Sequence, residues 1–545
     1  MSNQKKQSNF ILQAGILAAA GFISRIIGLL YVSPVQTIIG TVGFGYYSSA
    51  YTYYTIILLI SSYSIPSAIS KVIAQKLSVK EYRNAHRVFL CALYYVLGVG
   101  LLASLFLYFG AGLFVEKSAV PVLRVFAPTI FVYGILGVLR GYFQAHKSMV
   151  QTSVSQILEQ IVNAVVSIGA AYGFVQIAKK AAEEGEASNA AMYGAMGSAV
   201  GTGAGVLAAL LFMVGIYILN KDLIHRRIRR DKTVKVDSYK DISRVIAGVV
   251  LPFILSTAAY NLSASLNNKL YTSIMIYAKN VEETVVYNDY GIFSEAMKVS
   301  NIPIAFASAM AAAIIPTIAQ LVAIKDLKSS KEKIHQAVKT IMIVSIPSAV
   351  GLGVLAKPVI QLLFPTEAGL DVAGYTLMAL AVSVVFYALS TLSSSILQGI
   401  GRVNAPIINA VLALLIQTFV LVPLLFLTEW NVYVLAIAST VYSGAMCILN
   451  QISVRRALGY RQEIVGTFIL PTLAAICMGV AAWLVYAGMY FLTKSNVLSL
   501  ISAIMIAVVI YFVLLILFKG INEDELKAMP KGYMLVRVAK KCRLM

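Results

Sequence analysis

Residues Phe10 to Val32 read FILQAGILAAAGFISRIIGLLYV, an apolar stretch with one arginine set inside it. As a helix this stretch rises roughly 34 Å, enough to cross the hydrocarbon core of a bilayer, and Arg25 lies roughly 22 Å along it. A guanidinium that faces lipid costs at least ~2.5 kcal/mol, so we expect Arg25 to face the protein interior or a watery cavity. The alternative is that its side chain extends outward past Tyr31 to the lipid headgroups.

Small residues surround this arginine: Gly21, Ser24 and Gly28. In membranes, small residues let helix backbones approach closely, so this part of the helix is expected to pack against neighbouring helices and not against lipid. The pattern therefore predicts a cationic spot within a membrane cavity, suited to an anionic ligand.

The composition of the whole chain is that of a polytopic helical membrane protein. Its 545 residues are 59% hydrophobic and only 12% charged, whereas soluble domains are about 25% charged. The longest polar stretch, residues 220–241, is well below the ~40 residues that a domain without disulfides or bound metal needs to fold alone. The net charge of +21 does not indicate a nucleic-acid partner, because the basic residues lie in short loops between apolar spans.

Hydropathy predicts an all-α protein with fourteen membrane spans, at residues 10–32, 46–70, 88–112, 119–143, 150–176, 190–219, 243–277, 288–322, 338–362, 372–398, 404–428, 431–453, 463–492 and 496–519. If the N-terminus is inside, alternating segments place 34 Lys and Arg residues on the inner side and six on the outer side. The positive-inside rule then predicts a protein of the cytoplasmic membrane with both termini in the cytoplasm.

The chain repeats itself at an offset near 250 residues. Similar pairs occupy matching places in the topology: Ile65-Pro66 and Ile315-Pro316, His86 and His335, Gln144-Ala145 and Gln398-Gly399. Because the offset equals six spans, we predict two pseudo-symmetric six-helix lobes around a central cavity. The predicted parts are a first lobe (1–219), a basic linker (220–242), a second lobe (243–456), two further helices (457–519) and a basic tail (520–545).

Four other charges lie well inside predicted spans, away from the span ends, and each is a candidate site residue. Glu295 and Lys298 are one helical turn apart and can pair, either for function or only to fix packing. Lys269 follows two asparagines, which indicates either a wet surface or a side chain that extends to the membrane interface. Glu159 can pair with Arg25, carry a proton or bond a neighbouring backbone.

Other patterns bear on the class of protein. Tyr47, Tyr51 and Tyr54 share a helical face, where they can stack on a sugar or form an aromatic belt at the outer interface. The chain has no Walker A motif, and no hydrolase or metal-binding motif stands out. The sequence therefore predicts a transporter, not an enzyme, and no cofactor.

The chain also resembles a known family. The motifs Ser24-Arg25-Ile26-Ile27-Gly28, Ile65-Pro66-Ser67-Ala68, Arg140-Gly141-Tyr142-Phe143-Gln144, Ser155 to Gln160 and Asn301-Ile302-Pro303 are similar to those of the stage V sporulation protein B branch of the multidrug/oligosaccharidyl-lipid/polysaccharide exporter superfamily. The resemblance runs over essentially all fourteen spans. It implies a MurJ-like fold, with two six-helix lobes around a cavity and two added helices that form a groove for a lipid tail.

The implied activity is to flip an undecaprenyl-pyrophosphate-linked saccharide, lipid II or a polysaccharide unit, across the membrane. Arg25 matches a cavity arginine of the family's first helix, and Lys298 matches an arginine position on helix 8. The family pattern also has arginines near Tyr31, in helix 2 and at Asn163, and this chain lacks them. Expected partners are the lipid-linked substrate, membrane lipids and the enzymes of saccharide synthesis.

Two questions stay open at this point. The energy source can be the membrane potential, Na⁺ or H⁺. The alternative function is a cation-coupled multidrug exporter of the same superfamily, for which an acidic residue in a lobe cavity, such as Glu159 or Glu295, would be needed.

Overall fold

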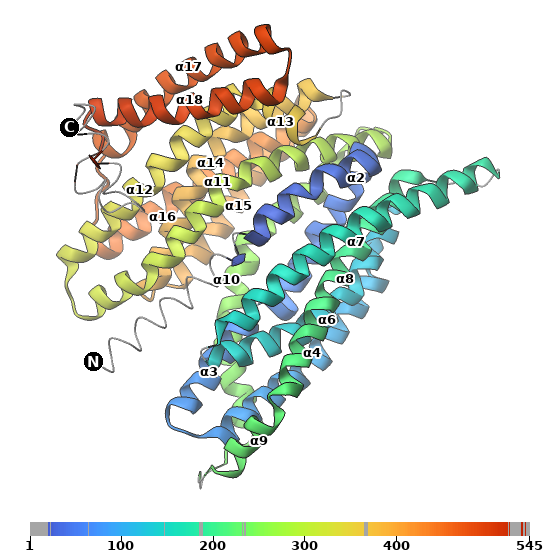
Figure 1. The fold of residues 1–545 in the computed structure, drawn as a ribbon, viewed down its shortest axis with the longest axis vertical. Coiled ribbons are helices and arrows are strands. Elements are labelled where there is room, and N and C mark those ends of the chain that lie inside the picture. The colour runs from blue at the N-terminus through green and yellow to red at the C-terminus, as the bar shows by residue number, and fades with distance from the viewer. Residues whose placement is uncertain are drawn as a thin grey trace. The chain divides into compact units, whose positions relative to one another are not determined.

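The structure is a computed structural model, and it describes residues 20–21, 23–63, 65–146, 148–184, 189–231, 233, 236–364, 369–521, 523, 536–537 and 540 (Figure 1). Residues 10–19 of the opening stretch and most of the predicted tail lie outside the described residues. Every element in the described part of the chain is helical. The first half contains a helical segment Ile23–Leu30, followed by α2 (Val32–Leu58), η1 (Leu59–Tyr63), α3 (Ile65–Ser78), α4 (Tyr82–Phe109), α5 (Ala111–Phe114), η2 (Lys117–Ala119), α6 (Val120–Ala145), α7 (Met149–Glu183), α8 (Ala190–Leu219) and α9 (Lys221–Arg229).

The second half contains α10 (Tyr239–Ser273), η3 (Ile274–Ala278), α11 (Glu283–Ala323), α12 (Leu327–Val354), α13 (Ala356–Leu363), α14 (Leu370–Gly399), α15 (Asn404–Leu427), α16 (Val432–Leu458), η4 (Val465–Ile469), α17 (Leu470–Thr493) and α18 (Asn496–Leu517). Among the described residues, ten helices are long and apolar enough to cross a membrane. A pair bent by 42°, Ile23–Leu30 with Val32–Ser61, makes an eleventh if it counts as one span. The membrane class and the all-α fold are thus confirmed, and the count of fourteen spans stays a prediction.

The chain turns at Gly40, inside α2. This residue has φ +71° and ψ 171°, a backbone conformation that is essentially restricted to glycine. After the turn, Gly43 packs against the backbone of Ala191 at the start of α8, and Tyr47 lies 3.5 Å from the hydroxyl of Thr202 further along α8. This part of α2 therefore runs parallel to α8. The predicted spans 10–32 and 46–70 imply a connecting loop over residues 33–45. In the structure these residues are helical, and the chain turns at a single glycine.

The structure divides into two compact units, Met1–Gly291 and Ile292–Met545, and α11 passes from one to the other. The helix α10 packs against α2, α3 and α4, so it belongs to the first unit. The sequence analysis assigned residues 243–277 to the second lobe instead. The arrangement of two six-helix lobes around a cavity stays a prediction.

In the first unit, α7 and α8 form the most extensive helix pair and lie side by side in Figure 1. Glycines on α8 permit this packing. A Cβ atom at Gly205 would lie 2.5 Å from the backbone oxygen of Glu159, and one at Gly201 would collide with Ser167. Such close backbone approach through small residues is typical of helices that associate in membranes. It brings the polar side chains of α7 into the interior of the unit.

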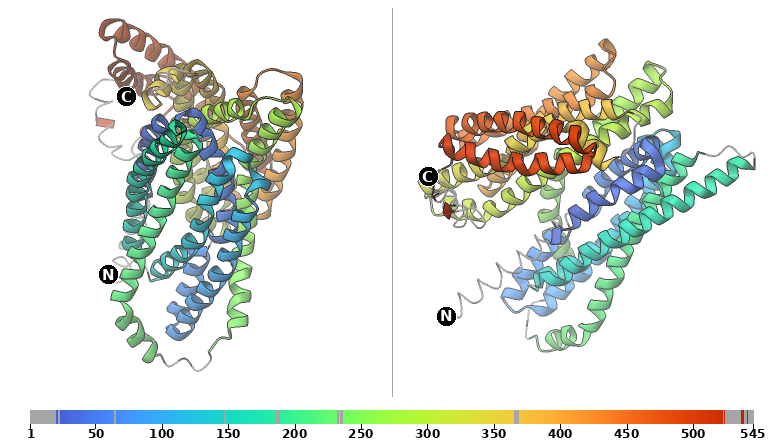
Figure 2. Two further views of the ribbon diagram at one scale, coloured as in Figure 1. Left: turned by 90° about the vertical axis from the view of Figure 1, so that its right-hand side faces the viewer. Right: turned by 45° about the horizontal axis from the view of Figure 1, so that its top comes forward.

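In the second unit, α12, α14 and α16 pack around one apolar core, and α17 and α18 form a hairpin against α12 (Figure 2). Tyr511 on α18 donates a hydrogen bond to the backbone oxygen of Ile343 on α12, at 2.9 Å. Many large apolar side chains of α17 and α18 are exposed, including Trp483 and Phe491. In a membrane protein such surfaces face lipid.

Candidate functional site

A stripe of polar side chains runs along α7 in the interior of the first unit. Ser155, Glu159, Asn163 and Ser167 follow one another at four-residue intervals, which places them on one helical face. Ser167 donates a hydrogen bond to the Asn163 side-chain oxygen at 2.9 Å, and the Asn163 amide donates to the Tyr31 hydroxyl at 3.3 Å. The stripe is thus part of a hydrogen-bonded network that reaches the first membrane helix.

The charged member of the stripe, Glu159, pairs with an arginine on α6. Its Oε2 lies 2.8 Å from Nη2 of Arg140, and the two side chains are only 15% and 6% exposed. The Nε of Arg140 also donates to the Ser155 hydroxyl at 2.9 Å. The structure shows Glu159 in an ion pair with Arg140, a partner that the sequence analysis did not consider. The sequence analysis missed this partner because Arg140 lies only three residues from the end of the predicted span 119–143 and was not among the candidate charges. The short turn between α6 and α7 is the signal that could have placed the two side chains at one level.

Arg25 lies in the segment Ile23–Leu30, and its side chain is exposed. Two contacts set its level in the first unit: a Cβ at Gly28 would lie 3.6 Å from the side-chain oxygen of Gln160, and Tyr31 bonds Asn163. Since these contacts advance by three residues on both helices, the segment runs parallel to α7. Arg25 therefore lies at the level of residues 156–159, close to the charged end of the stripe.

The hydrogen bond between Tyr31 and Asn163 joins two positions where this chain departs from the family pattern. Both positions were expected to carry or neighbour an arginine, and here a hydroxyl and an amide replace the charges. Two arginines in contact would repel each other, whereas Tyr and Asn satisfy each other. The two departures are therefore neighbours in space.

Lys269 belongs to a network near the ends of α10 and η3. Its Nζ lies 3.2 Å from Oε1 of Glu116. That carboxylate also accepts a hydrogen bond from the hydroxyl of Tyr277, and the backbone N–H of Glu116 donates to the hydroxyl of Tyr287 at 3.2 Å. The side chain of Glu116 is 8% exposed and that of Lys269 is 38% exposed. Lys269 is thus held in an ion pair within the first unit.

The two asparagines before Lys269 do not form a wet surface. Asn267 and Asn268 are 3% and 1% exposed, and the Asn268 amide donates to the hydroxyl of Ser49 on α2 at 2.9 Å. The expectation of a wet polar patch is wrong here. These amides join helices inside the unit, because a buried amide needs a partner.

Glu295 and Lys298 lie on α11, at the start of the second unit. Glu295 is buried, with 3% exposed, and Lys298 is half-buried. Their separation of one turn brings them within electrostatic range of each other. In the first unit the structure therefore brings Arg140 and Glu159 into contact, with Arg25 at the same level along the first helix. In the second unit it brings Glu295 close to Lys298.

The tyrosines of α2 form a stacked ladder inside the first unit. The ring centroids of Tyr47 and Tyr51 are 5.8 Å apart, as are those of Tyr51 and Tyr54, and Tyr54 lies 4.9 Å from Phe126 of α6. Tyr47 and Tyr54 are 3% and 2% exposed. The expectation of an aromatic belt at the membrane interface is thus wrong for these two rings, which pack in the core.

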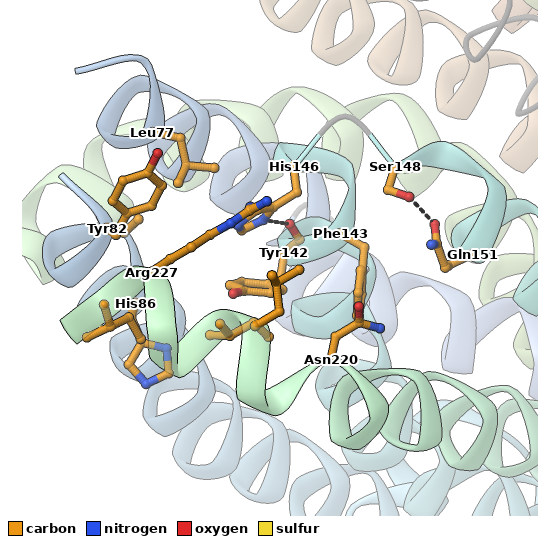
Figure 3. Close-up of a pocket in the computed structure, with 14 residues that line it drawn as sticks. Leu77, Tyr82, His86, Tyr142, Phe143, His146, Ser148, Gln151, Asn220 and Arg227 are labelled. Carbon is orange, nitrogen blue, oxygen red and sulfur yellow. Dashed lines mark hydrogen bonds between the residues drawn. The ribbon is translucent and has the colours of Figure 1, made fainter. Parts of the chain in front are cut away.

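A cavity of about 260 Å³ lies among the end of α3, the start of α4, the end of α6 and α9 (Figure 3). Its walls are largely apolar and aromatic, and the side chain of Arg227 extends across it toward His146. The His146 Nδ1 lies 2.9 Å from the backbone oxygen of Tyr142. Burial lowers the pKa of His146, and the charge of Arg227 lowers it further. Within the described residues, no cluster of His, Cys, Asp and Glu side chains could hold a metal ion.

Comparison with known proteins finds relatives over nearly the whole chain. A family profile described as polysaccharide biosynthesis protein matches residues 12–322, and a profile named MatE matches residues 290–424. The lipid II flippase MurJ of Bacillus subtilis (strain 168) is 25% identical over 511 residues, 89% of each chain. Stage V sporulation protein B of the same organism is 22% identical over 543 residues, 97% of this chain and 100% of the relative.

Solved structures show the same fold. A structure of lipid II flippase MurJ in an inward closed conformation superimposes with a TM-score of 0.64 at 16% sequence identity, and the match covers 92% of this chain and 98% of that one. The similarity extends across both units, so the helices are connected in the same order in the two proteins.

Proposed function

Because the chain belongs to the polysaccharide biosynthesis protein family, we propose that it is a flippase that moves an undecaprenyl-pyrophosphate-linked saccharide across the cytoplasmic membrane. The observation that carries this proposal is the position of Arg25. It is a cation with an exposed side chain on a membrane helix, level with a polar stripe in the interior of the unit. A lipid-linked diphosphate is an anion that must cross an apolar barrier, and arginine binds phosphate oxygens through paired charge-assisted hydrogen bonds.

In this proposal the diphosphate binds Arg25, and Lys298 supplies a second positive charge. The saccharide travels with the headgroup, while the polyprenyl tail remains in the lipid along α17 and α18, whose exposed apolar side chains suit it. Movement of the two predicted lobes then exposes the site to the outer side. The chain has no Walker A motif, so the driving force in this scheme is the membrane potential or an ion gradient.

A cation-coupled exporter is the second candidate, and the MatE match over residues 290–424 is the observation that favours it. Export of cationic drugs requires a carboxylate that is free to bind positive charge. Glu159 is already neutralised by Arg140, and Glu295 lies within range of Lys298. A basic residue thus lies beside each of the two carboxylates, which supports a site for anions and not for cations.

The test is complementation of a bacterium depleted of its own lipid II or polysaccharide flippase, with drug-resistance assays on the same clones. The wild type should restore growth, and Arg25→Ala should abolish rescue while the protein stays folded in the membrane. Arg124→Ala is the matched control, because Arg124 is an exposed arginine whose Nε donates to the backbone oxygen of Tyr108 at 3.3 Å. Full rescue by Arg25→Ala, or drug resistance without rescue by the wild type, would contradict the proposal.

A further inference from the structure

The ion pair of Arg140 with Glu159 has a neutral counterpart in the second unit. An offset of 254 residues, which aligns Gln144 with Gln398, also aligns Arg140 with Ser394 and Ser155 with Asn409. In the second unit, Asn409 donates to the side-chain oxygen of Asn450 at 2.8 Å, and Asn450 donates to the hydroxyl of Ser394 at 2.8 Å. Each unit thus joins these equivalent helices through buried polar groups, by direct contact in the first unit and through Asn450 of α16 in the second.

Only the junction in the first unit is charged. In the second unit the polar groups that join these helices are amides and hydroxyls. The repeat therefore shows that this junction can be built without an ion pair. Bringing two charges into a low-dielectric interior is costly, and well-packed neutral groups often serve stability equally well. A role beyond structure is therefore the reason to keep Arg140 and Glu159 charged.

Exposure increases in order from Arg140 through Glu159 to Arg25. The Arg140 side chain is 6% exposed and that of Glu159 is 15% exposed. Arg25, which lies at the same level along the first helix, is an exposed residue. Glu159 is paired with Arg140 of α6, and Tyr54 of α2 lies within electrostatic range of it. The helix α8 contributes the backbone at Gly205. Glu159 thus lies between a buried guanidinium and the level at which an anion would meet Arg25.

We propose that Glu159 is a displaceable partner that keeps Arg140 from binding anions until the diphosphate arrives, which rests on the function proposed above. When a diphosphate binds beside Arg25, a phosphate oxygen replaces the carboxylate on Arg140, because the guanidinium binds phosphate in the same two-bond geometry as carboxylate. Arg140 is in this scheme a second arginine of the diphosphate site.

The experiment measures binding of a polyprenyl-diphospho-N-acetylglucosamine to the full-length protein in nanodiscs at neutral pH. Glu159→Gln keeps a hydrogen-bonding partner for Arg140 but has no charge. It should bind the probe at least about tenfold more tightly than the wild type, because the phosphate then displaces a neutral amide and not a carboxylate.

The double variant Arg140→Gln with Glu159→Gln keeps uncharged hydrogen-bonding groups at both positions and is therefore expected to fold. It should lose at least about tenfold in affinity relative to Glu159→Gln alone. Asn409→Ala loosens the equivalent junction of the second unit and should leave the affinity as in the wild type. Equal binding by the double and single variants, or wild-type affinity in Glu159→Gln, overturns this inference. If the wild type binds no lipid-linked diphosphate, the proposed function itself fails.

Discussion

Removal of the Glu159 side chain tests whether a buried charge pair holds α6 and α7 together. At the observed distance of 2.8 Å, the attraction of the two charges is about 6 kcal/mol for an effective dielectric constant of about 20. Desolvation offsets much of this gain in the intact pair. In Glu159→Ala, however, Arg140, whose side chain is 6% exposed in the intact pair, keeps its hydrogen bond to the Ser155 hydroxyl but loses its counter-charge. Breaking a buried pair in this way costs about 3 to 5 kcal/mol, and the partial exposure of Glu159 places our expectation near 3 kcal/mol.

The assay is reversible unfolding in mixed micelles with increasing sodium dodecyl sulfate, followed by tryptophan fluorescence or by pulse proteolysis. A double variant, Arg140→Met with Glu159→Leu, should recover most of the lost stability, because no unpaired charge remains. Asp371→Ala is the control, since the side chains of its pair with Lys357 are 48% and 68% exposed. That control should lose no more than about 1 kcal/mol. A Glu159→Ala protein as stable as the wild type would refute the reasoning.

Three further outcomes follow from the fold. Gly40→Ala should lower the unfolding free energy by about 1 to 3 kcal/mol, because φ +71° with ψ 171° is strained for any side chain. The comparison is Gly21→Ala, where an added Cβ has nothing within 4 Å. Equal losses in the two variants would contradict the turn at Gly40. Gly201→Val should reduce folded yield, since a Cβ there meets Ser167, and normal folding would mean that α7 and α8 are further apart. Because burial lowers the pKa of His146, the unfolded chain binds a proton first as the pH falls through about 6.5, so thermal stability should drop in acid. His146→Gln should show a smaller drop, and an equal one would contradict this.

The sequence predicts local properties of this protein well. The hydropathy of each segment reports whether it prefers lipid, and that preference depends on composition over some twenty residues, not on the rest of the fold. The family motifs around Arg25 and Pro66 are likewise continuous in sequence. Membrane class and helical architecture therefore follow without any knowledge of contacts. The turn at Gly40, in contrast, depends on a backbone angle that hydropathy does not report.

Partner choice, in contrast, depends on which helices meet. Glu159 could have paired with several groups, and the close packing of α7 with its neighbours decided for Arg140. Lys269 pairs with Glu116, which is 153 residues away in the sequence. Asn268 donates a hydrogen bond to Ser49, which is 219 residues away. Tyr31 and Asn163 read as two separate departures from a family pattern until the fold placed them in contact. A hydrogen bond or an ion pair acts over a few ångströms. Its partners are settled only when packing has brought distant segments together, whereas the tendency of each segment to enter the membrane is present in the chain before it folds.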